Sequence, residues 1–98
     1  MDETPPKDAP PSEADALPEI DFGTFVMSLA TSVLVHLGEI KHPDSAADER
    51  NPALAKQTID ILGMLREKTR GNLTHEETQL IENLLYDLRM KYVAAKKR

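Results

Sequence analysis

The chain lacks cysteine and tryptophan, and its only aromatic residues are two tyrosines and two phenylalanines among 98 residues. Without cysteine it has no disulfide, no thiolate metal ligand and no cysteine nucleophile. This usage is typical of a reducing compartment, so we expect a cytoplasmic location. A chain of this length forms at most one ordinary domain. The first residues have no basic segment followed by an apolar one, so we also expect no secretory signal.

Negative charge is concentrated at the N-terminus. Residues 1–21 carry seven acidic side chains and one lysine, a net charge of −6, whereas residues 22–98 have a net charge of +1. Five of the seven prolines also lie in residues 1–20. Such a composition offers little apolar surface to bury. We therefore predict a disordered, acidic, proline-rich tail over 1–20 and a single helical domain over 21–98.

Apolar residues in the rest of the chain recur at helical spacing, and no segment alternates with the period of a strand. We predict an all-α fold with helices over about 21–40, 52–70 and 75–94. The short glycine-containing turn between the second and third helices predicts that these two form an antiparallel hairpin. Gly71 in this turn is expected to take the left-handed conformation.

The start of each predicted helix has its own signal. Asp21 is an N-cap residue before the first helix. Asn51 followed by Pro52 is a strong start signal for the second, because proline at the first helical position loses no helical hydrogen bond. Thr74 and Glu77 have the spacing of a capping box at the start of the third.

The first predicted helix is unusual because residues 22–38 contain no Asp, Glu, Lys or Arg. A helix that is apolar nearly all round is normally buried nearly all round. Two partner helices cover about half of its circumference, so we predict that a second copy of the chain covers the remainder, with a dimer as the first expectation. A different protein partner is the alternative. The candidate residues for self-association are Phe22, Phe25, Val26, Leu29, Val33, Leu34 and Leu37.

A membrane is a less suitable cover for this helix. Spanning a bilayer requires about 20 apolar residues, and this segment is shorter and interrupted by polar side chains. It also lacks the cationic face of a helix that lies on a membrane surface. We expect no transmembrane span.

The polar side chains give little indication of a metal site or a catalytic site. His36, Glu39 and His42 are spaced as HxxExxH, but no second pair of ligands accompanies them, so we expect no metal and no cofactor. No nucleophile, base and pocket are indicated together, and we do not expect an enzyme. The candidates for structural pairing are Asp60, Asp87 and Arg89; a pair such as Asp60 with Arg89 would fix the register between helices or subunits.

The basic residues indicate an alternative function, which is binding to nucleic acid or the ribosome. A patch near the predicted turn, joined by the C-terminus, would bind nucleic acid or the ribosome through salt-sensitive phosphate contacts. The nearly neutral charge of residues 22–98 and the scarcity of aromatics favour a solvated surface instead. The candidate residues are Arg66, Lys68, Arg70, Lys96, Lys97 and Arg98.

Residues 64–93 read MLREKTRGNLTHEETQLIENLLYDLRMKYV, residues 51–65 read NPALAKQTIDILGML and residues 21–40 read DFGTFVMSLATSVLVHLGEI. Together these segments resemble a small bacterial family catalogued as domain of unknown function 1844. The resemblance covers about residues 20–93 and excludes the acidic tail. It implies a shared helical architecture and no particular activity. We therefore expect a helical interaction or regulatory module that self-associates without catalysis.

Overall fold

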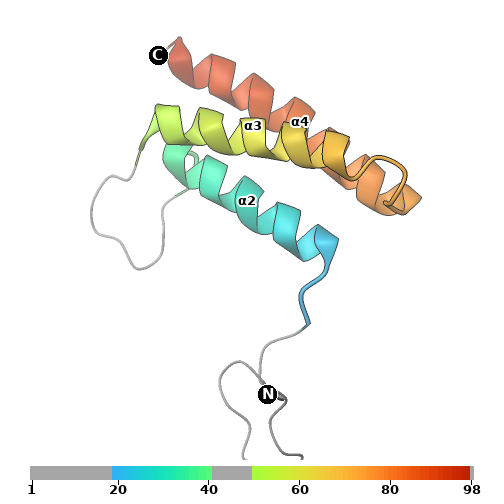
Figure 1. Ribbon diagram of the computed structural model, residues 1–98. Helices are drawn as coiled ribbons and strands as arrows, with labels where there is room; N and C mark the ends of the chain where they lie inside the picture. The colour runs from blue at the N-terminus through green and yellow to red at the C-terminus, as the bar shows by residue number, and fades with distance from the viewer. Residues whose placement is uncertain (1–18, 41–49, 98) are drawn as a thin grey trace, which may run out of the picture.

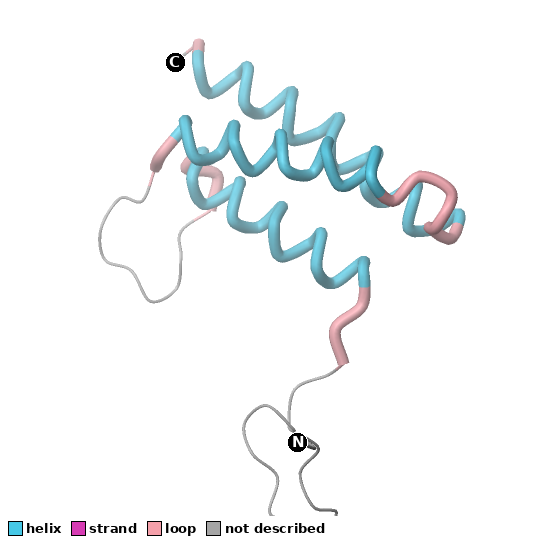
Figure 2. The backbone as a smooth tube through the Cα atoms, in the orientation of Figure 1, coloured by secondary structure: helices cyan, strands magenta, loops and turns pink. Residues whose placement is uncertain are grey.

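The computed structural model describes residues 19–40 and 50–97, which form three α-helices and, within these two ranges, no strand (Figure 1). Helix α2 spans Phe22–Leu37, α3 spans Pro52–Lys68 and α4 spans His75–Lys96. Loops lie only at the helix ends in the described backbone (Figure 2). The all-α prediction is confirmed. The predicted acidic tail lies outside the described residues except for its last two positions.

The first two helices begin where predicted. The Asp21 carboxylate accepts a hydrogen bond from the Thr24 N–H at 2.7 Å and caps α2. The Asn51 side chain accepts one from the Leu54 N–H at 3.1 Å and caps α3, with Pro52 as the first helical residue. Each cap satisfies a backbone donor that has no partner inside the helix.

Helix α2 ends three residues earlier than predicted. Gly38 adopts a left-handed conformation with φ of 81°, and its N–H donates to the carbonyls of Leu34 and Val35. This geometry turns the chain out of the helix axis and satisfies the last carbonyl groups. Gly38 is therefore the residue that ends α2.

Helices α3 and α4 are joined by a tight turn. Helix α3 ends two residues before the predicted boundary, where the Thr69 hydroxyl donates to the Leu65 carbonyl at 2.7 Å. Gly71 follows with φ of 87°, which confirms the predicted left-handed residue. The capping box of α4 is formed: the Glu77 N–H donates to the Thr74 hydroxyl at 3.1 Å, and the Thr74 N–H donates to the Glu77 carboxylate at 2.9 Å.

The three helices form a bundle in which each contacts the other two. The end of α2 meets the start of α3, because the Asn51 N–H donates to the His36 carbonyl at 2.8 Å. The start of α2 meets the start of α4, because a Cβ atom on Gly23 would lie 3.5 Å from Leu80. Helix α3 is therefore antiparallel to both of its neighbours (Figure 1).

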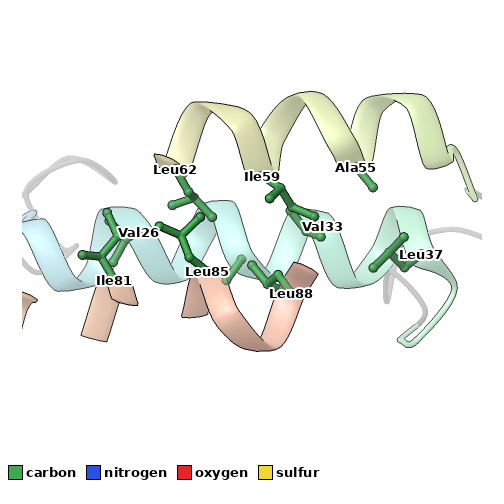
Figure 3. Packing of buried hydrophobic residues seen from close by; sticks show 10 residues of the cluster. Val26, Val33, Leu37, Ala55, Ile59, Leu62, Ile81, Leu85 and Leu88 are labelled. Atoms are coloured by element: carbon green, nitrogen blue, oxygen red, sulfur yellow. The ribbon is translucent and has the colours of Figure 1, made fainter. Parts of the chain in front are cut away.

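The core lies between the three helices and is built from side chains of all of them (Figure 3). Val26, Leu62 and Ile81 are completely buried, one from each helix. Burial of a side chain of this size contributes about 1.5–3 kcal/mol. The buried hydrophobic cluster comprises Val26, Ala30, Val33, Leu37, Ala55, Ile59, Leu62, Ile81, Leu85 and Leu88.

Candidate interaction surfaces

Most of the predicted self-association residues are used inside one chain. Val26, Val33 and Leu37 belong to the buried core. This corrects their assignment to an interface: α3 and α4 together cover the most regular apolar stripe of α2, so these three side chains stabilise the single chain. Three others are half-buried and pack against the same core, namely Phe22, Leu29 and Leu34. The remaining candidate, Phe25, is 41% exposed.

The outward side of α2 is uncharged and partly apolar. We define the α2 outer face as Thr24, Phe25, Met27, Ser28 and Thr31, all of which are exposed. Met27 is 45% exposed. The Ser28 hydroxyl donates to the Phe25 carbonyl at 2.7 Å, and the Thr31 hydroxyl donates to the Met27 carbonyl at 3.0 Å. Because these hydroxyl donors bond to their own helix, they do not have to be stripped of water when the face is covered.

A second exposed apolar stripe runs along α4. Tyr86, Met90 and Val93 are 72%, 58% and 51% exposed, and they are spaced by four and three residues. We define these three residues together with Asn83 as the α4 outer seam. The sequence pattern alone does not single it out, because the more hydrophobic stripe that forms the core runs along the same helix. The sequence feature that could have identified the α4 outer seam is the spacing of its residues, which alternates between three and four.

The α4 outer seam borders a groove between α3 and α4. Part of this groove is a shallow hollow of about 610 Å³, which the four seam residues line together with Arg66, Glu82 and Arg89. A neighbouring hollow of about 200 Å³ shares Arg89 and Val93 with it and ends at Lys56. Arg89 and Val93 therefore lie between the two hollows and line both of them.

The predicted structural pair does not form within the chain. The Asp60 carboxylate is bonded to Lys56 on the same helix at 2.7 Å, with both side chains largely exposed, and this hydrogen bond raises the pKa of Lys56. Asp60 and Arg89 line the same hollow. In the described part of the chain, no ion pair joins Arg89 to Asp60 or to Asp87. A pairing between subunits stays a prediction.

The predicted basic residues lie in two separate groups. Arg66 and Arg70 both bond to Glu67, at 3.3 and 2.7 Å. The bond to Arg70 is the main reason that the pKa of Glu67 lies below its ordinary value. Lys68 is exposed in the last turn of the same helix.

The second basic group is at the far end of α4. Lys96 and Lys97 lie at its C-terminus, about 30 Å from its start at 1.5 Å per residue, whereas Arg70 lies in the turn that precedes α4. The Lys96 ammonium lies 5.7 Å from the centre of the Tyr92 ring. Arg98 is outside the described residues. The structure does not bring the two groups together into one patch.

Residues 19–40 and 50–97 contain no group of three His, Asp or Glu side chains placed to hold a metal ion. His36 lies 3.4 Å from the Ser32 hydroxyl, and His42 of the HxxExxH pattern is outside the described residues. No helix in these ranges is both long enough and apolar enough to cross a membrane.

Residues 19–40 and 50–97 thus form a bundle of three helices with two partly apolar outer surfaces, the α2 outer face and the α4 outer seam. The chain belongs to the family described as Domain of unknown function (DUF1844), whose family model matches residues 19–94. This confirms the family that the sequence resembles. Comparison with curated proteins and with solved structures gave no match.

Proposed function

We propose that this domain is a non-catalytic interaction module that self-associates through the α2 outer face. The observation that supports it is the absence of any Asp, Glu, Lys or Arg from Phe22–Leu37, on the outward side of the helix as well as in the core. An outward side that faced only water would ordinarily carry charged residues. This one exposes Phe25 and Met27 instead.

The energy available from covering this face is large for so small a domain. Burial of apolar surface contributes roughly 25 cal/mol per Å², so a few hundred Å² contribute several kcal/mol. That is comparable with the total stability of about 5–15 kcal/mol of an ordinary domain. Ser28 and Thr31 are small, so two copies of α2 can approach closely about a twofold axis, the commonest symmetry of oligomers.

A charge placed on the α2 outer face tests this proposal. Ser28→Glu should lower the mass of the assembly and leave the chain folded, because association through this face would bury an unpaired carboxylate. Ala53→Glu is the matched control, since Ala53 is exposed on α3 outside this face. Sedimentation and light scattering give the mass, and circular dichroism checks that the helices are retained. A wild-type chain that is folded and monomeric at micromolar concentration would refute the proposal.

Nucleic-acid or ribosome association takes second place. It would require a continuous basic surface, but the basic residues lie at two ends of α4, and Arg66 and Arg70 already bond to Glu67. Binding of this kind should weaken steeply between about 50 and 200 mM salt. Neutralising Arg66, Lys68 and Arg70 and deleting Lys96, Lys97 and Arg98 should together abolish such binding. Full binding after both changes would exclude these basic residues as its contacts.

A further inference from the structure

We propose that the α4 outer seam is a second self-association surface, which pairs in antiparallel orientation with the same seam of another copy of the chain. The seam and the α2 outer face are on different helices, so this inference does not depend on the first interface. Two properties of α4 indicate that a second copy of α4 covers the seam. They are the spacing of its exposed apolar residues and the order of the charges beside them.

The spacing matches a partner helix. Asn83, Tyr86, Met90 and Val93 alternate at intervals of three and four residues, the repeat by which side chains of two helices interdigitate along a seam. If α4 of a second copy runs in the opposite direction, Tyr86 of one copy contacts Met90 of the other, and this layer occurs twice about the twofold axis. Contact between a thioether and an aromatic ring is favourable. Val93 then lies beside Asn83 of the other copy in the outer layers.

The charges beside the seam favour the antiparallel orientation. Glu82, Arg89 and Lys96 follow one another at intervals of seven residues, so they lie along one side of the seam. Reversal of the partner places Glu82 of each copy beside Lys96 of the other, which gives two ion pairs of opposite charge. In a parallel pair, Glu82 would instead approach Asp87 of the other copy, which is a repulsive contact.

Charges near the twofold axis do not oppose the pairing strongly. The two copies of Arg89 would approach each other there, but a guanidinium nitrogen of Arg89 lies 3.2 Å from the position of a Cβ atom on Gly63, so this side chain is drawn back over α3. The two copies of Asp87 would face each other on the opposite side. Asp87 is exposed to solvent, where salt screens the repulsion.

The absence of cysteine makes the register directly testable. Chains carrying Asn83→Cys are mixed with chains carrying Val93→Cys under mild oxidation. The mixture should form a disulfide-linked dimer about tenfold faster than a mixture of Ala53→Cys with Val93→Cys, because residues held side by side have a high effective concentration. Each variant oxidised alone is the control for orientation: in the antiparallel register its two thiols are about 15 Å apart along the helix, too far for a disulfide.

The outcomes separate this interface from the α2 outer face. Cross-linking of the mixture, without cross-linking of either variant alone, supports the antiparallel seam. A mixture that reacts no faster than the Ala53→Cys control overturns the proposal, and fast reaction of Asn83→Cys alone overturns the orientation. The cross-link should persist when both chains also carry Ser28→Glu. Its loss in that background would show that the α4 outer seam is not an independent surface.

Discussion

The guanidinium group of Arg89 on α4 lies across Gly63 of α3, where a Cβ atom would come within 3.2 Å of a guanidinium nitrogen. Glycine inside a helix destabilises it by roughly 0.5–1 kcal/mol relative to alanine. Here it leaves the space in which Arg89 crosses the groove between the two helices. Gly63 therefore weakens α3 locally but leaves room for Arg89. Arg89 is the one charged side chain that lines both hollows of that groove.

Replacing this glycine tests how firmly Arg89 is held. Gly63→Ala should raise the free energy of unfolding by about 0.5–1 kcal/mol, because the end of a long flexible side chain can move aside. Denaturant unfolding measures the change. The same substitution in an Arg89→Ala background is the control, and the gain should be equal there. A loss of stability in the wild-type background alone would show that the guanidinium is fixed in place.

The two left-handed glycines should differ in their sensitivity to a side chain. A Cβ atom on Gly38 would lie 2.6 Å from the Arg50 side chain, whereas one on Gly71 would meet nothing within 4 Å. Both substitutions to alanine incur the left-handed backbone cost of roughly 1–2 kcal/mol. We expect Gly38→Ala to cost more, since Arg50 must also be displaced. Thermal unfolding of both variants checks this order, and equal losses would contradict it.

The start of α2 should make stability depend on acidic pH. The hydrogen bond from the Thr24 N–H holds the pKa of Asp21 below its ordinary value. A carboxyl group whose pKa is lower in the folded state contributes stability above its unfolded pKa of about 3.9 and loses it as the pH falls through the folded pKa. Stability should therefore fall below about pH 4.

Asp21→Asn separates this effect from the titration of other carboxylates. Asparagine is also a good N-cap residue, but it has no proton to gain. The variant should therefore lose less stability than the wild type as the pH falls below about 4, the region in which the lowered pKa of Asp21 makes stability depend on pH. Denaturant unfolding at a series of pH values measures the difference between the two proteins. Identical pH dependence would mean that the Asp21 cap does not contribute.

Local features of this fold were readable from the sequence. The three caps at Asp21, Asn51 and Thr74 were predicted because each depends on side-chain and backbone groups within three residues of one another. The ends of α2 and α3 were harder to predict than their starts. Helix α2 stops at Gly38 because a single residue takes positive φ, although the apolar pattern continues to Ile40.

The surfaces were harder to predict because they depend on how the helices are placed. The sequence shows that α2 is apolar nearly all round, but it does not show which stripe α3 and α4 cover. Val33 and Phe25 therefore looked alike, although only Phe25 is exposed. Local competition explains the missing ion pair: Lys56 is one helical turn from Asp60 and bonds to it without any tertiary contact. Arg89 therefore does not bond to Asp60, and its guanidinium group lies over α3 near Gly63.

Two substitutions on α2 should distinguish the core of the chain from its interface. Val33 is completely buried, so Val33→Asp would place a carboxylate among apolar side chains without a partner. We expect this variant to be unfolded at every protein concentration, because an unpaired buried charge costs several kcal/mol, much of the stability of a small domain. Thr31→Asp is the matched change at an exposed position two residues away.

The Thr31→Asp chain should keep its helices and lose only its association through the α2 outer face. Its hydroxyl bond to the Met27 carbonyl is a local contact of an exposed residue, so little of the fold depends on it. Circular dichroism and sedimentation over a range of concentrations measure folding and assembly separately. Refolding of the Val33→Asp chain at high concentration would mean that assembly builds the core, contrary to the burial of Val33 within one chain. An assembly of Thr31→Asp with the same mass as the wild type at the same concentration would remove the α2 outer face as an interface.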